Sequence, residues 1–132
     1  MGLRWYSTVV DAVDHHSLAH WWAEALGWQV WVDSELEAVV VPPWAGELVG
    51  QLPFERVPPG MVFVPTGVTK SGKNRLHWDF APQSDDERAA EIERLVGLGA
   101  SVIDVGQPAD ATWTVLADPE GNEFCVLSAR DA

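Results

Sequence analysis

Apolar and polar positions follow a strand pattern and then a helical pattern in the first half of the chain. Residues 5–13 are rich in Val and Thr, which predicts a strand ending at Asp14. Asp14 is suited to cap the N-terminus of a helix, and Gly27 is suited to end that helix in a left-handed conformation. Between them, apolar residues recur at helical spacing: Leu18, Trp21, Trp22, Ala25 and Leu26. The remaining strands of this half are expected at 28–32, 36–41 and 48–57.

The same order returns in the second half, after a segment with little periodicity. Residues 58–74 contain three prolines, three glycines and two lysines, which is typical of a linker. Residues 75–81 predict a strand, and the run from Ser84 to Glu87 predicts a capping box for a second helix that ends at Gly99. Further strands are expected at 100–105, 112–117 and 123–128, with a tight turn at 118–122.

Both halves therefore have the order β-α-β-β-β. Two helices facing a predominantly antiparallel sheet system predict an α+β fold. We expect a first module at residues 1–57, a linker at 58–74 and a second module at 75–132, together forming one domain.

Composition and charge restrict the possible functions. The chain has 132 residues, 47% of them hydrophobic, which suffices for a packed core, and no stretch approaches the about 20 apolar residues needed to cross a bilayer. A formal net charge of −12 argues against nucleic acid as a partner and favours a neutral or cationic ligand, although acidity alone also keeps a protein soluble. The single cysteine, Cys125, excludes an internal disulfide, and the N-terminus lacks a signal segment, so we expect a cytoplasmic protein.

Three segments resemble motifs of the vicinal-oxygen-chelate superfamily, which includes glyoxalases, bleomycin-resistance proteins and dioxygenases. Residues 118–124, Asp-Pro-Glu-Gly-Asn-Glu-Phe, resemble the hairpin before its last strand. Residues 14–27, with the pair Trp21-Trp22, resemble its first helix. Residues 73–79 resemble the opening of the second module in the actinobacterial-type glyoxalase-like branch.

The resemblance covers nearly the whole chain and has consequences for architecture. It implies paired βαβββ modules that form a curled, mostly antiparallel sheet around an open cleft, and it implies a homodimer. Members of the superfamily include lyases, isomerases, epimerases and dioxygenases, but also antibiotic-binding proteins without a metal. The fold therefore does not determine the function.

The resemblance also identifies four positions at which family enzymes hold a divalent metal. Here these positions carry Ser7, Glu55, His77 and Cys125. His77 matches the usual His, Glu or Gln ligands and Glu55 is compatible with them, whereas a hydroxyl and a thiol replace two strong ligands. We therefore expect no cofactor and no catalytic metal; if a divalent metal is bound, His77 and Glu55 are its expected ligands.

Strand alternation predicts which other side chains face the cleft. If His77 points inward, Arg75 and Asp79 share its face, and Leu76 packs beneath the second helix with its neighbours at 78 and 80. The expected catalytic residues are His77, Glu55 and Glu123. The expected ligand-binding residues are Ser7, Arg75, Trp113, Val115 and Cys125.

Two other groups of residues have more than one interpretation. His15, His16 and His20 are expected at the solvated face of the first helix; alternatively, His16, His20 and Glu24 follow one another at four-residue intervals and could hold a metal. Cys125 lacks a His–Asp arrangement at the spacing of a known nucleophile site, so we interpret it as a small buried side chain.

The sequence thus supports three functions, in the following order. The first is a protein that binds a small organic molecule, a drug or a metabolite, without a catalytic metal. The second is a lyase or isomerase acting on a small carbonyl or thioester substrate, with His77 and a carboxylate or a divalent metal moving a proton. The third is an accessory module whose cleft receives a partner. No membrane is expected as a partner.

Overall fold

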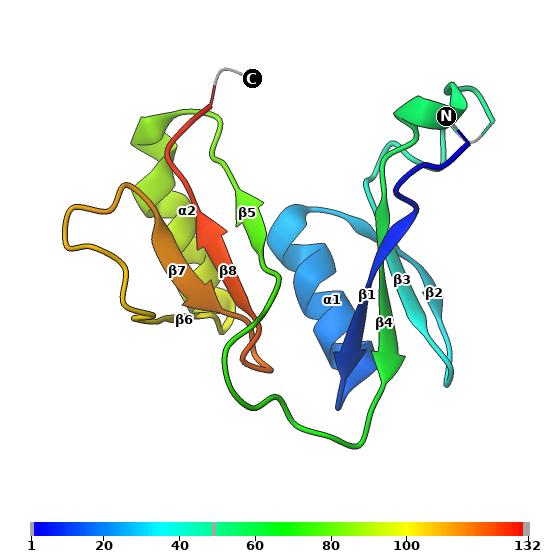
Figure 1. Ribbon diagram of the computed structural model, residues 1–132. Helices are drawn as coiled ribbons and strands as arrows, with labels where there is room; N and C mark the ends of the chain where they lie inside the picture. Colours follow the sequence, from blue (N-terminus) through cyan, green and yellow to red (C-terminus); the bar gives the residue numbers. More distant parts are fainter. Residues whose placement is uncertain (1, 49, 131–132) are drawn as a thin grey trace. The chain divides into compact units, whose positions relative to one another are not determined.

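The computed structural model describes residues 2–48 and 50–130, and the chain divides into two compact units, residues 1–69 and 70–132. Figure 1 labels the elements of each unit. Unit 1 contains β1 (Ser7–Ala12), α1 (His15–Leu26), β2 (Gln29–Asp33), β3 (Ala38–Val41), the 3-10 helix η1 (Phe54–Arg56) and β4 (Gly60–Pro65). Unit 2 contains β5 (Trp78–Phe80), α2 (Asp85–Leu98), β6 (Ser101–Val102), β7 (Thr114–Ala117) and β8 (Glu123–Val126).

Each unit forms an open four-stranded sheet, and the two sheets have the same topology. The strand order is β1-β4-β3-β2 in unit 1 and β5-β8-β7-β6 in unit 2. The first and last strands of each unit pair in parallel, and the other neighbours are antiparallel. The predicted α+β fold with two βαβββ modules and mostly antiparallel pairing is confirmed.

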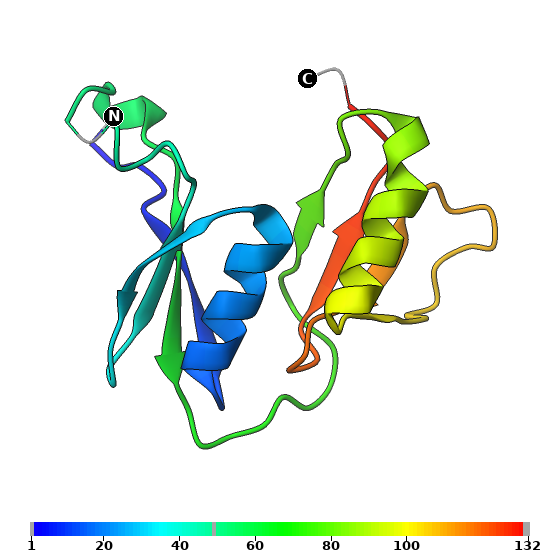
Figure 2. The same ribbon diagram turned by 180° about the vertical axis from the view of Figure 1, so that it is seen from behind.

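Helix α1 covers one face of the first sheet, as both ribbon views show (Figures 1 and 2). Its ends follow the predicted caps: the Asp14 carboxylate accepts a hydrogen bond from the Ser17 backbone N–H at 3.1 Å, and Gly27 is left-handed with φ 66°. Trp22 of the helix and Phe63 of β4 are completely buried in the core of this unit. Burying each such side chain contributes about 1.5–3 kcal/mol or more to stability.

Helix α2 covers the aromatic face of the second sheet. Phe124 is buried at the centre of this face and contacts Phe80 edge to face, with ring centroids 5.9 Å apart. Of the residues of α2, all of which are described, Leu95 alone is fully buried. Arg88 reaches from α2 to the sheet, where its Nη2 donates to the Thr114 hydroxyl at 2.8 Å.

The start of α2 differs from the predicted capping box. Ser84 occupies the N-cap position, but within the part of the chain that the structure describes its side chain makes no capping hydrogen bond. The first turn instead carries three acidic residues, Asp85, Asp86 and Glu87, whose charges stabilise the positive end of the helix dipole. The Asp85 carboxylate also accepts from the Ala129 N–H at 2.7 Å, which ties the C-terminal segment to this helix start.

The predicted strand at 48–57 is wrong, and so is the linker character of 60–65. Turns and η1 occupy the described residues of the first segment, 48 and 50–57, and residue 49 lies outside the described residues, whereas β4 spans Gly60–Pro65 and pairs along β1. Pro53 within this segment and the prolines at 58 and 59 directly after it explain the first error, because each lacks the backbone donor that a strand needs. The connection between the units therefore begins only after Pro65. No helix among the described residues is long and apolar enough to cross a membrane.

Candidate functional site

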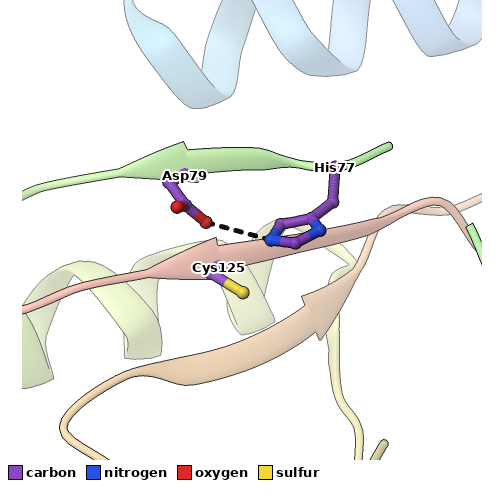
Figure 3. A group of neighbouring side chains, drawn as sticks. All are labelled: His77, Asp79 and Cys125. Atoms are coloured by element: carbon purple, nitrogen blue, oxygen red, sulfur yellow. Dashed lines mark ion pairs between the residues drawn. The ribbon is translucent and has the colours of Figure 1, made fainter. Parts of the chain in front are cut away.

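Three chemically active side chains lie together on the face of the second sheet opposite α2. Asp79 of β5 pairs directly with Cys125 of β8, so both point to the same side of the sheet, and His77 precedes Asp79 by two residues. The ligand atoms of the three residues all lie within 4.8 Å of one another. Figure 3 shows His77, from the residue just before β5, and Asp79 of β5 with Cys125 beside them, and His77 Nε2 lies 3.3 Å from Asp79 Oδ1.

The polar pair is accessible, whereas its surroundings in the sheet are apolar. The side chains of His77 and Asp79 are 45% and 51% exposed, but Cys125 is only 6% exposed. Val115 of β7 lies directly opposite Cys125 and is also buried. An exposed imidazole–carboxylate pair thus stands beside a buried apolar floor.

The thiol of Cys125 is held in its protonated form. Burial raises the pKa of Cys125, and the negative charge of Asp79 together with a side-chain hydrogen bond to it raises the pKa further. The thiolate is the nucleophilic and metal-binding form of cysteine, so this environment opposes both roles. The prediction that Cys125 is a small buried side chain is confirmed.

Glu123, predicted as a catalytic carboxylate, is buried and engaged with the loop that precedes β5. Its Oε2 accepts from the Asn74 backbone N–H at 2.5 Å, and its Oε1 lies 3.2 Å from Lys73 Nζ. The Glu123 N–H donates in return to Asn74 Oδ1 at 3.3 Å. Burial by itself would raise the pKa of Glu123, but the hydrogen bonds from Asn74 and Lys73 outweigh it and lower the pKa. We call Glu123, Lys73 and Asn74 the loop clamp.

The other predicted site residues are distributed over both units. In unit 1, Ser7 begins β1, half-buried opposite Gly60, and Glu55 is exposed in η1. Placing Glu55 on a strand was wrong, for the same reason that the strand at 48–57 does not form. In unit 2, Trp113 is half-buried immediately before β7.

The predicted alternation of side chains between the two faces of the sheet does not hold for Arg75 and Leu76. Arg75 and Leu76 lie in a bend, because β5 begins only at Trp78. Leu76 is 87% exposed, so the prediction that it packs beneath α2 was wrong. From His77, the residue directly before β5, the alternation holds, and the His77 and Asp79 side chains lie close together. Asp79 was missing from the predicted site residues, although its two-residue spacing from His77 was the signal that could have included it.

The sequence pattern of the glyoxalase-like domain matches residues 7–127. The chain belongs to the glyoxalase-like domain family. No curated protein matches the sequence significantly.

Several solved structures share the glyoxalase-like fold at low sequence identity. A glyoxalase/bleomycin resistance protein/dioxygenase family enzyme from Burkholderia phytofirmans PsJN superimposes with a TM-score of 0.69 at 14% identity, covering 94% of this chain and 97% of its own. The fosfomycin resistance protein FosX from Mesorhizobium loti gives 0.63 at 12% identity, covering 95% and 91%. A variant of FosX from Listeria monocytogenes, complexed with Mn(II) and 1S,2S-dihydroxypropylphosphonic acid, gives 0.68 at 10% identity, covering 99% and 93%. At these identities the comparison shows the fold alone.

The donors present here do not reproduce the metal-binding set of the metal-dependent family members. Ser7 offers a weak hydroxyl ligand, and Glu55 is not on a strand. His77, Asp79 and Cys125 lie close enough together to hold an ion, but Cys125 offers a thiol with a raised pKa. No reaction step is therefore assigned to a metal at this site.

Proposed function

We propose that this glyoxalase-like protein binds a small organic molecule on the face of the β5-β8-β7 sheet opposite α2, without a catalytic metal. The observation that carries the proposal is the exposed His77–Asp79 pair beside the buried Cys125 and Val115. Small-molecule sites typically combine an apolar lining with a few convergent polar groups that orient the ligand. The function is drug or metabolite binding of the kind known from bleomycin-resistance proteins.

Charge indicates the class of molecule. The exposed carboxylate of Asp79 and the net charge of −12 favour a neutral or cationic ligand over an anionic one. The half-buried Trp113, two residues before Val115, offers an indole surface on which an aromatic or cationic ligand can stack.

The experiment is a binding screen with aromatic amines and neutral aromatic metabolites, read by quenching of tryptophan fluorescence. For a compound that binds, His77→Ala and Asp79→Asn are expected to weaken affinity at least tenfold, because each removes half of the polar pair. Leu76→Ala is the matched control, since Leu76 adjoins His77 in the sequence but is exposed in the preceding bend. Unchanged affinity in both His77→Ala and Asp79→Asn would show that the ligand binds at another site.

A second function is favoured by one specific observation, the 3.3 Å separation between His77 Nε2 and Asp79 Oδ1. A carboxylate beside an imidazole orients the ring, which is part of the arrangement of a general base. The protein would then be a lyase or isomerase acting on a small carbonyl or thioester substrate. Glu123 is not available for this role, because the loop clamp uses both of its oxygens. Turnover that His77→Ala abolishes while binding persists would favour this function over simple binding.

The absence of a catalytic metal is tested by elemental analysis of protein loaded with Zn, Mn, Fe, Co or Ni and then desalted. The ion count is compared between the wild type and His77→Ala, so that only an ion requiring His77 is scored. Near one such ion per chain would overturn the metal-free proposal. The homodimer, the cytoplasmic location and the actinobacterial-type branch stay predictions.

A further inference from the structure

A second group of metal-binding side chains lies in unit 1, outside the site described above. His16 and His20 are one helical turn apart on α1, and both contact the carboxylate of Asp33 at the end of β2. His16 Nδ1 hydrogen-bonds to Oδ1, and His20 Nε2 lies 2.8 Å from Oδ2. His16 and His20 thus each contact one oxygen of the same carboxylate, although they lie 17 and 13 residues before Asp33 in the sequence.

The neighbouring contacts hold Asp33 in this place. His15 is buried at the start of α1, and its Nε2 lies 2.7 Å from the carbonyl oxygen of Ser34, the residue after Asp33. The Ser34 N–H donates to the Glu37 carbonyl at 2.8 Å, and its hydroxyl accepts from the Glu37 N–H at 3.2 Å. The turn between β2 and β3 is therefore fixed internally and attached to α1. This finding also corrects the expectation that His15 is solvated.

We propose that His16, His20 and Asp33 bind one divalent transition-metal ion of the zinc, nickel or copper class. Histidines four residues apart on a helix face the same side, which is the spacing that places two imidazoles on one ion. Imidazole nitrogen with one carboxylate oxygen is a donor set preferred by these ions over magnesium or calcium. Asp14 and Glu35 add negative charge near His16, which attracts a cation.

Binding of the ion replaces the His16–Asp33 and His20–Asp33 contacts. In the metal-free protein each imidazole contacts a different carboxylate oxygen, and both rings are partly or largely exposed. Binding of one ion by both rings therefore requires these exposed side chains to rotate toward a common point. The bound ion connects α1 to the end of β2, so we expect it to stabilise unit 1.

The third ligand distinguishes this site from a bare helical histidine pair and from the alternative based on sequence spacing. Spacing alone suggested Glu24 as the partner of His16 and His20. In the structure Asp33, from another element, contacts both imidazoles. Substituting Glu24 and Asp33 one at a time therefore shows which of the two carboxylates is the third ligand.

The experiment is a calorimetric titration with Zn²⁺ at mildly alkaline pH, made in a His77→Ala background so that the β5–β8 cluster cannot contribute its imidazole. We expect one ion per chain, a rise in the thermal midpoint on binding, and at least a tenfold loss of affinity in Asp33→Asn and in His20→Ala. Asp33→Asn removes the charge but keeps the shape, and Glu24→Gln is the matched control that should bind like the parent. Circular dichroism verifies that each variant is folded.

Three outcomes would contradict the proposal. Absence of zinc binding overturns it outright. Equal affinity in the parent and Asp33→Asn shows a histidine pair without the proposed third ligand. Loss of affinity in Glu24→Gln but not in Asp33→Asn assigns the ion to the helix alone. As an independent readout, the imidazole NMR signals of His16 and His20 should shift on adding zinc.

Discussion

Substitution of Glu123 tests whether this residue holds the loop or performs chemistry. In Glu123→Ala, the Asn74 N–H loses its carboxylate acceptor and Lys73 loses its partner. A hydrogen bond to a charged group contributes about 1.5–3 kcal/mol, and the Lys73 side chain, 59% exposed, adds at most about 1 kcal/mol after solvent screening. We therefore expect Glu123→Ala to reduce the free energy of unfolding by about 2–3 kcal/mol. Glu123→Gln retains an acceptor oxygen and should cost about 1 kcal/mol.

The assay is urea unfolding followed by tryptophan fluorescence and circular dichroism. With a slope of about 1–3 kcal/mol per molar urea, the expected loss for Glu123→Ala lowers the midpoint by roughly 1–2 M. Glu93→Gln on the exposed surface of α2 is the control for loss of one negative charge, and it should stay within about 0.5 kcal/mol of the wild type. An unchanged midpoint in Glu123→Ala would refute the loop clamp and return Glu123 to the candidate catalytic residues.

The same contacts predict the pH dependence of this stabilisation. The folded pKa of Glu123 lies below its ordinary value of 4.5, so the unfolded state binds a proton before the folded state does. The contribution of Glu123 is therefore fully present above about pH 4.5 and is lost as the pH falls through the folded pKa. The difference in unfolding free energy between the wild type and Glu123→Gln should shrink on acidification. A difference that stays constant into the acid range would show that the ionised carboxylate is not what holds the loop.

Two further predictions concern backbone conformation and thiol reactivity. Gly27→Ala should destabilise the protein by about 1–2 kcal/mol, because an L-residue resists the left-handed cap with φ 66°. Gly97→Ala in α2, where an added Cβ meets nothing within 4 Å, should stabilise the protein by about 0.4–1 kcal/mol. Thermal unfolding compares the two variants, and a change of the same sign in both would contradict the assignment of the cap. Cys125 should react slowly with iodoacetamide at neutral pH until urea unfolds the chain, because it is buried and its pKa is raised; rapid alkylation of the native protein in mass spectra would show an accessible thiolate.

The sequence was sufficient for those elements whose ends are determined by local chemistry. Asp14 precedes the first residue of α1 and Gly27 follows its last residue, because a carboxylate cap and a left-handed glycine act on the residues next to them. The 118–122 turn is likewise local: the Asp118 carboxylate accepts from the N–H groups of Glu120 and Asn122, both at 2.9 Å. Such signals do not depend on the rest of the fold, so one sequence reveals them.

The fourth strand was missed for another reason. The apolar run Met61-Val62-Phe63-Val64 favours a strand, but it is short and lies between Pro58-Pro59-Gly60 and Pro65, residues that are typical of a connection. It becomes a strand because β1 and β3 flank it on both sides, which is a long-range condition. Because Glu55 was chosen as a site residue from its position on the strand predicted at 48–57, the error in locating the fourth strand also misplaced Glu55.

Long-range contacts also give Asp79 and Glu123 different environments, although strand alternation alone places both on the same face of the sheet. Asp79 and Glu123 both point to the face opposite α2, and each has a basic partner, His77 and Lys73 respectively. The loop before β5 covers Glu123 and supplies a backbone N–H to it, whereas nothing comparable buries Asp79, which stays half exposed. A buried carboxylate with both oxygens engaged stabilises the fold, and an exposed carboxylate beside an imidazole can still exchange its partner for a ligand. In the proposed binding function, His77 and Asp79 are the groups that contact the ligand, and Glu123 contributes only by fixing the loop from which β5 begins.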